Sequence, residues 1–125
     1  MAGAGAILLV EDDPVLGPLL VSLLESGGHT NVLLAADAPD AHALVERFGG
    51  EIAVLVVDVG LPSLRGDQLA HRLAARLPRL RVVLMSGYVD ERARPPGTPA
   101  SWRSLAKPFT AEELLAAVAS ALDAE

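Results

Sequence analysis

The stretch that decides the fold is ILLVEDDP, residues 7–14, in which an apolar run ends in three successive acids. The four apolar residues 7–10 form a short continuous run, which is typical of a strand that is buried on both faces. Glu11, Asp12 and Asp13 follow at once, and their like charges repel one another. A surface turn tolerates such crowding, whereas a site that holds a cation requires it.

Apolar runs alternate with helix-period segments along the rest of the chain. The segments predicted as strands are 6–10, 31–36, 52–58, 81–87 and a short run within 103–109. The segments predicted as helices are 14–28, 38–50, 65–78 and 110–125. A weak helix and a Pro/Gly loop are predicted at 88–101, between the last two strands. Strands without a polar face indicate a parallel sheet that helices cover on both sides. With right-handed crossovers, the predicted fold is an α/β doubly wound five-stranded sheet.

Composition restricts the class of protein. The chain has 125 residues, 16 acids against 10 basic residues, a net charge of −6 and no cysteine. Its length predicts a single domain over residues 1–125. The negative charge argues against direct nucleic-acid binding, and the lack of cysteine excludes disulfides and thiolate zinc sites. Because no apolar run approaches the ~20 residues of a membrane span and the start is unlike a signal peptide, we expect a cytoplasmic domain without membrane contact.

Polar side chains follow the predicted strands at their carboxyl ends, where doubly wound sheets bind ligands. They are Glu11, Asp12, Asp58, Ser86 and Lys107. Carboxylates at this density suit Mg²⁺ (or Mn²⁺), a hard cation that also binds phosphate oxygens. An amine and a hydroxyl can contact a phosphate, and an aspartate between metal and amine can accept a phosphoryl group as a nucleophile. The set therefore predicts Mg²⁺-dependent phosphoryl transfer to Asp58.

The chain resembles the response-regulator receiver domain of two-component signalling over nearly its whole length. The segments that carry the resemblance are LLVEDDP (8–14), VVDVGLP (56–62) with Gly66 following, LMSGY (84–88) and LAKPF (105–109). Each motif alone is weak, but all four occur in order, each at a predicted strand end. The resemblance implies a flavodoxin-like sheet in the order 2-1-3-4-5, and LMSGY looks most like receivers attached to, or paired with, hybrid sensor histidine kinases.

The family's functional residues transfer position by position. The matching metal ligands are Asp12, Asp58, the backbone carbonyl of Gly60, and Glu11, which usually acts through water. By the same resemblance Asp58 is the phospho-acceptor, Ser86 moves toward the phosphate, and Lys107 pairs with it before a Lys-Pro bond that is commonly cis. The implied partner is a sensor histidine kinase or a histidine phosphotransfer protein. Such a domain is no enzyme beyond catalysing its own phosphorylation and dephosphorylation, and it signals by a conformational change.

Two features depart from the family pattern. Ser104 stands where the family usually has an aromatic residue whose rotation reports phosphorylation, and Trp102 is out of register for that position. The fourth helix is interrupted by Pro95, Pro96 and Pro99, which do not fit a regular helix. Our hypothesis is that the signal is carried by the loop 88–101 rather than by an aromatic rotamer.

Alternatives stay open at this point. A degenerate receiver could serve only as a protein-interaction module. A phosphatase of the haloacid-dehalogenase type also uses a nucleophilic aspartate, but it would need an acid at the position of Gly60. A cofactor-binding flavodoxin-like module would need a Ser/Thr/Gly-rich loop where EDDP (11–14) stands. The blandest interpretation makes these acids a solvated turn before a helix.

Overall fold

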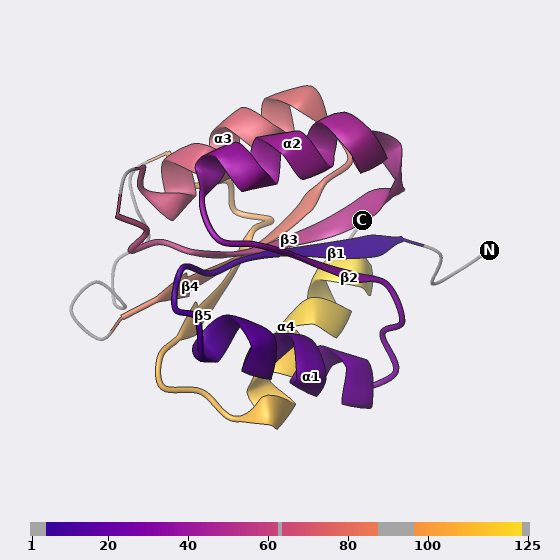
Figure 1. Ribbon diagram of the computed structural model, residues 1–125, viewed down its shortest axis with the longest axis vertical. Coiled ribbons are helices and arrows are strands. Elements are labelled where there is room, and N and C mark those ends of the chain that lie inside the picture. The colour runs from indigo at the N-terminus through magenta and orange to yellow at the C-terminus, as the bar shows by residue number, and fades with distance from the viewer. Residues whose placement is uncertain (1–4, 63, 88–96, 124–125) are drawn as a thin grey trace.

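A parallel five-stranded sheet forms the centre of the computed structural model, which describes residues 5–62, 64–87 and 97–123 (Figure 1). Its strands are β1 (Ala6–Val10), β2 (Val32–Ala35), β3 (Ile52–Asp58), β4 (Arg81–Ser86) and β5 (Arg103–Ala106). Their order in the sheet is β2-β1-β3-β4-β5. The predicted strands, the parallel sheet and the order 2-1-3-4-5 are all confirmed.

Helices cover both faces of the sheet, α2 and α3 on one face and α1 and α4 on the other (Figure 1). Their bounds are α1 (Leu16–Ser26), α2 (Ala38–Phe48), α3 (Gly66–Arg76) and α4 (Ala111–Asp123), and a short 3₁₀ turn (Gly49–Glu51) follows α2. The segment 110–125 thus supplies α4, and residues 88–96 of the predicted weak helix lie outside the described residues. Among the helices that the structure describes, none is long and apolar enough to cross a membrane.

The sheet divides the apolar core into two layers. All five residues of β1 are buried, and so are six of the seven in β3. Because successive side chains point to opposite faces, Leu8 and Leu55 pack under α2 and α3, whereas Leu9 and Val56 pack under α1 and α4. The central strands therefore need apolar residues on both faces, and the sequence is apolar throughout β1 and in β3 up to Asp58.

The strand registers bring the carboxyl ends of the strands to one edge of the sheet. Val10 lies opposite Val57, and Asp58 lies opposite Met85. Ser86 lies opposite Ala106, directly before Lys107. Polar residues that follow these strands are therefore neighbours in space.

Candidate phosphoryl-acceptor and metal site

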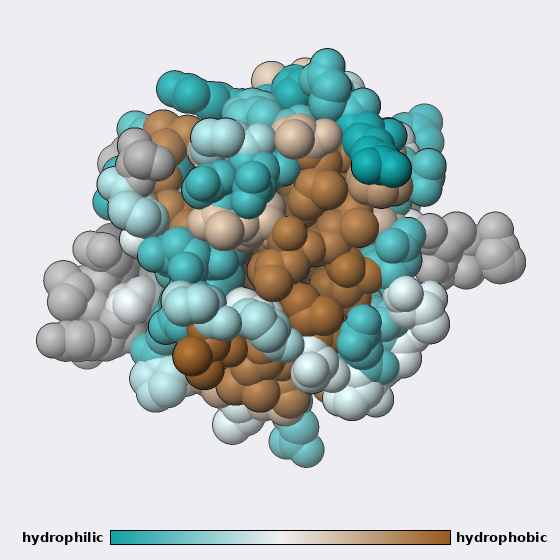
Figure 2. All heavy atoms as spheres, viewed as in Figure 1, coloured by the Kyte–Doolittle hydropathy of each residue, from teal (hydrophilic) through white to brown (hydrophobic). Residues whose placement is uncertain are grey.

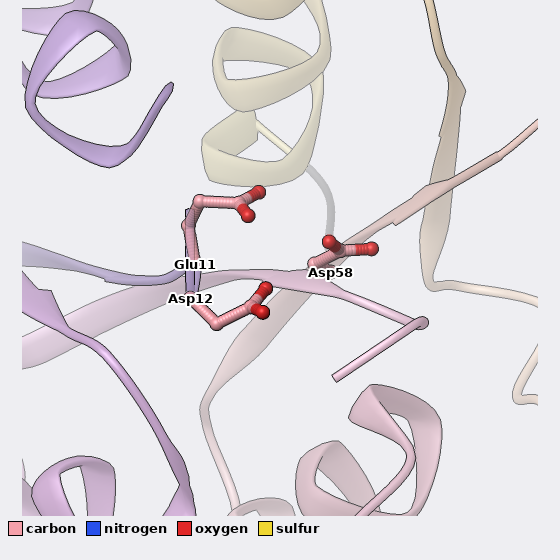
Figure 3. Close-up of side chains that lie close together, drawn as sticks. All are labelled: Glu11, Asp12 and Asp58. Carbon is pink, nitrogen blue, oxygen red and sulfur yellow. The ribbon is translucent and has the colours of Figure 1, made fainter. Parts of the chain in front are cut away.

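Three carboxylates converge at this edge. Glu11 and Asp12 follow β1, and Asp58 is the last residue of β3. Each offers an oxygen, and these oxygens all lie within 4.8 Å of one another. Figure 3 shows the side chains of Glu11 and Asp12 turned toward Asp58. Three hard oxygen ligands in so small a space fit the coordination that Mg²⁺ prefers.

Lys107 supplies the positive charge beside the acids. Its Nζ lies 3.0 Å from Oδ2 of Asp58 and 3.3 Å from Oε1 of Glu11. The residue is positioned where β5 ends, because its backbone N–H donates to the carbonyl of Ser86 at 2.8 Å. The following bond, Lys107–Pro108, is cis, as the resemblance implied. One ammonium group therefore contacts two of the three carboxylates.

Burial dominates the electrostatics of the site. The pKa of the Glu11 carboxyl is raised overall, and the largest cause is burial, since Glu11 is 3% exposed. The charge of Asp58 also raises this pKa, whereas the N–H of Asp13 and the ammonium of Lys107 lower it. Burial lowers the pKa of Lys107, but the hydrogen bond and charge of Asp58, with those of Glu11, outweigh it and raise the pKa overall. The three carboxylates carry more negative charge than the one ammonium group of Lys107 neutralises. A divalent cation would neutralise the excess negative charge.

Backbone groups hold the Asp58 side chain and the end of β3 in place. The N–H of Gly60 donates to Oδ1 of Asp58 at 3.0 Å. Gly66, the first residue of α3, lies so close that a Cβ there would overlap the carbonyl oxygen of Asp58, and its N–H donates to the carbonyl of Val59 at 2.9 Å. A side chain at this position would push the end of β3 away from α3, so the glycine in the motif has a steric reason.

The remaining candidate residues separate into two roles. Ser86 is half-buried at the end of β4, on the same edge as the acids. Asp13 is exposed, and its Oδ1 accepts from the N–H groups of Val15 and Leu16, at 2.8 Å and 3.1 Å. Asp13 therefore caps the chain segment that leads into α1, and these two N–H bonds lower its pKa.

Trp102 does not occupy the usual position of the switch aromatic residue, as its register predicted. It is buried in the core layer under α2 and α3, and its ring centroid lies 4.7 Å from that of His71. Ser104, at the usual position of the aromatic switch residue, is exposed on β5. The aromatic side chain nearest to that position in sequence is therefore a packing residue.

A groove beside Lys107 was not predicted from the sequence. It has a volume of about 320 Å³ and its lining is mostly apolar. Its walls come from α1 and the turn after β5, namely Leu16, Leu19, Leu20, Leu23, Lys107, Pro108 and Phe109. Leu19 is 51% exposed there. The signal in the sequence was the width of the leucine stripe on α1, which exceeds what contact with the sheet requires.

Comparisons with a family model and with known protein sequences all point to the same family. Residues 7–119 match the model of the response regulator receiver domain. The chain is 32% identical to the sensor kinase CckA of Brucella abortus, over 98% of this chain and 13% of that protein. It is 37% identical to the response regulator protein FleR of Pseudomonas aeruginosa, over 93% of this chain and 24% of that protein. It thus spans under a quarter of the length of these two relatives.

Solved structures agree with the sequence comparisons. A receiver domain from the hybrid histidine kinase CckA superposes with a TM-score of 0.79 at 27% identity, covering 95% of this chain and all (100%) of that one. A response regulator receiver protein from Sinorhizobium medicae superposes with a TM-score of 0.84 at 27% identity, covering 97% of this chain and 96% of that one. Both similarities extend over nearly the whole sheet and its helices.

Proposed function

The chain belongs to the response regulator receiver domain family, and from this membership we propose that Asp58 accepts a phosphoryl group in a reaction that requires Mg²⁺. The observation that carries the proposal is the ammonium of Lys107 at 3.0 Å from Oδ2 of Asp58, beside carboxylate oxygens of Glu11 and Asp12. A carboxylate between a lysine and a cation-binding group is the arrangement that a phosphoryl acceptor needs.

The proposed step is a displacement at phosphorus. A carboxylate oxygen of Asp58 forms a bond to the phosphorus of a phosphohistidine, and the bond from phosphorus to the imidazole nitrogen breaks. The electron pair leaves with the imidazole, which takes up a proton from water. Lys107 offsets the charge on the transferred oxygens, and the hydroxyl of Ser86 donates a hydrogen bond to one of them.

Glu11, Asp12, Asp58 and the backbone carbonyl of Gly60 would hold the metal, with Glu11 acting through water. When bound, Mg²⁺ (or Mn²⁺) would neutralise the acids and the developing charge on the phosphoryl oxygens. The close spacing of the three carboxylates supports this assignment, because their negative charges repel one another, and burial together with the charge of Asp58 raises the pKa of Glu11. By the same proposal the chain catalyses only its own phosphorylation and dephosphorylation and otherwise acts as a signalling domain.

In this proposal the phosphoryl donor is a sensor histidine kinase or a histidine phosphotransfer protein, and the transfer takes place in the cytoplasm.

A donor protein must bring its histidine to Asp58. Lys107 lines both the site and the apolar groove on α1. We assign this groove to an apolar helix of the donor beside its histidine. The groove's continuity with the acceptor site supports that occupant, since a helix seated there lies next to the reacting carboxylate.

Acetyl phosphate tests the acceptor without a partner. With Mg²⁺, the intact mass should rise by about 80 Da, one phosphoryl group, and peptide mapping should locate it on Asp58. Asp58→Asn and removal of Mg²⁺ with a chelator should each abolish the gain. Asp123→Asn, which removes an exposed acid at the end of α4, is the matched control. If the wild-type chain gains no mass and does not bind beryllofluoride with Mg²⁺, the degenerate interaction module replaces this proposal.

A further inference from the structure

The outer edge of β2 is a surface that the proposed phosphoryl transfer does not use. β2 pairs with β1 along one edge, and no other strand in the described ranges pairs with its second edge. Its sequence, VLLA, has no charge and no proline, and its pairing with β1 runs without a bulge. Natural edge strands usually carry a charged residue, a proline or a bulge, because an edge without such protection pairs with other strands.

The backbone of β2 points two residues outward. The carbonyls of Asn31 and Ala35 accept from the N–H groups of Ile7 and Glu11, at 2.9 Å and 3.0 Å, so these carbonyls face β1. Alternate residues of a strand direct their backbone groups to opposite edges. The N–H and C=O groups between them, those of Val32 and Leu34, therefore face outward in the plane of the sheet.

Apolar side chains surround this edge. Figure 2 shows a hydrophobic band across the face of the molecule between α2 and α1, with hydrophilic residues around it. Leu34 is 40% exposed and lies over Gly17 of α1, where a Cβ would come within 3.3 Å of its Cδ1. Half-buried apolar residues of β2, α1 and α2 include Val21, Val32, Leu33, Leu44 and Phe48. Unpaired backbone and apolar side chains thus lie together.

We propose that β2 pairs antiparallel with β2 of a second copy of this chain and joins the two sheets into one. The two-fold axis passes at Leu33, so that Val32 of each copy exchanges both backbone hydrogen bonds with Leu34 of the other. The two Leu33 side chains then meet on the α2 side of the sheet, and Val32 meets Leu34 on the α1 side. The pairing is isologous and closes after two copies.

Charge complementarity argues for a second copy as the occupant. The two-fold axis sets α2 antiparallel to α2 of the other copy, because both helices lie on the same face of the joined sheet. Asp40 lies in the first turn of α2 and Arg47 in the last turn, and both are exposed. Each Arg47 therefore lies toward the Asp40 end of the other helix. On the opposite face, α1 carries Glu25 as its single charge, so no row of like charges opposes the contact.

The proposed acceptor site stays open in this arrangement, since Asp58 is the last residue of β3 and β1 lies between β3 and the β2 edge. Sedimentation of the unphosphorylated chain over a concentration series should give a reversible monomer–dimer equilibrium. Leu34→Lys should raise the dissociation constant at least tenfold. Leu122→Lys is the matched control, because Leu122 is also 40% exposed but lies on α4. Thermal unfolding by circular dichroism checks that each variant is folded.

Two further sets of variants test the register and the occupant. Asp40→Lys and Arg47→Glu should each weaken the dimer by about threefold to fivefold, and the double variant should restore it. Because the chain has no cysteine, Leu33→Cys should form a disulfide across the axis under mild oxidation, whereas Leu122→Cys should not. A wild-type monomer at every concentration, assemblies larger than a dimer, or a dimer that Leu34→Lys leaves unchanged would each overturn the proposal.

Discussion

The ammonium nitrogen of Lys107 lies 3.0 Å from Oδ2 of Asp58, although 49 residues separate the two in the sequence. Lys107 is the single lysine of the chain, and its Nζ also lies 3.3 Å from Oε1 of Glu11. It is the counter-charge of a cluster of three carboxylates. A bound cation and this lysine would therefore both neutralise the acids. Replacing the lysine should for this reason change the affinity for Mg²⁺ and the rate of phosphorylation in opposite directions.

Lys107→Gln should strengthen Mg²⁺ binding and slow phosphorylation. Removing a positive charge beside the acids relieves its repulsion of the metal, so we expect the affinity for Mg²⁺ to rise about fivefold. The rate of phosphorylation by acetyl phosphate should fall about a hundredfold, because a charge that contacts the transferred oxygens is lost. Calorimetry and timed mass spectrometry measure the two effects. Arg72→Gln, an exposed charge of α3, is the control, and an unchanged rate in Lys107→Gln would remove the lysine from the proposed step.

Mg²⁺ should stabilise the folded chain through its acids. At tenfold above the dissociation constant, binding to the native state alone adds about 1.4 kcal/mol to the free energy of unfolding. Asp12→Asn should abolish this gain while making the metal-free chain more stable, since it removes one of three mutually repelling carboxylates. Urea unfolding with Mg²⁺ and with a chelator gives both numbers. Asp123→Asn should keep the full gain; a Mg²⁺ effect that persists in Asp12→Asn would place the metal elsewhere.

Gly66→Ala should destabilise the chain and disable the acceptor site. The added Cβ would overlap the backbone carbonyl of Asp58, so the end of β3 or the start of α3 must move. We expect a loss of roughly 3 kcal/mol in the free energy of unfolding. Gly50→Ala is the matched control, because its Cβ meets nothing within 4 Å and its φ is not positive. Equal stability of the two variants would contradict the close packing of α3 on the acceptor strand.

The sequence predicted the sheet well because its central strands have no exposed face. Up to Val10 and Val57 these two strands are apolar at every position, and the acids that follow mark their ends, so the sequence indicated both the strands and where they stop. The strand order came from the family resemblance, since apolar runs alone do not say which strands are neighbours. The convergence of Glu11, Asp58 and Lys107 was predicted from their positions at the carboxyl ends of the strands, and the structure places Nζ of Lys107 within hydrogen-bond distance of both acids.

The sequence did not predict the exposed apolar surfaces on α1 and β2, because exposure depends on which other elements cover a residue. Helical periodicity places Leu19 on the apolar face of α1, but it does not say how far the neighbouring elements extend over that face, and Leu19 is half exposed. The same holds for Leu34 in β2, whose exposure follows from its place at the sheet edge. The hypothesis about the loop 88–101 falls largely on residues 88–96, outside the described ranges, and stays a hypothesis.

Thr110→Ala should weaken the attachment of α4. Oγ1 of Thr110 accepts from the N–H of Glu113 at 3.0 Å, and Oε1 of Glu113 accepts from the N–H of Thr110 at 2.8 Å, so the two residues form a capping box at the start of α4. Losing the hydroxyl should cost about 1 kcal/mol in the free energy of unfolding. Thr30→Ala, at an exposed position in the turn before β2, should change it by less than about 0.5 kcal/mol. Urea unfolding of both variants makes the comparison, and equal losses would show that the cap adds nothing.

Leu19→Asp should separate a protein donor from a small one. The side chain lines the groove beside Lys107 and is 51% exposed, so a charge there is tolerated in the free chain but is buried under a docked apolar helix. A panel of phosphorylated histidine phosphotransfer domains first identifies one that phosphorylates the wild-type chain. With that donor, transfer to Leu19→Asp should slow at least about tenfold, a cost of roughly 1.4 kcal/mol.

Acetyl phosphate needs no docking surface, so Leu19→Asp should react with it at the wild-type rate. Leu122→Asp, a similar change on α4 at a position 40% exposed, should leave both reactions unchanged. Slowing with both donors would mean that Leu19→Asp disturbs Lys107 rather than docking, because the two residues share the groove. Slowing with neither would assign the donor to another face of the domain, since a helix in the groove cannot avoid the new charge.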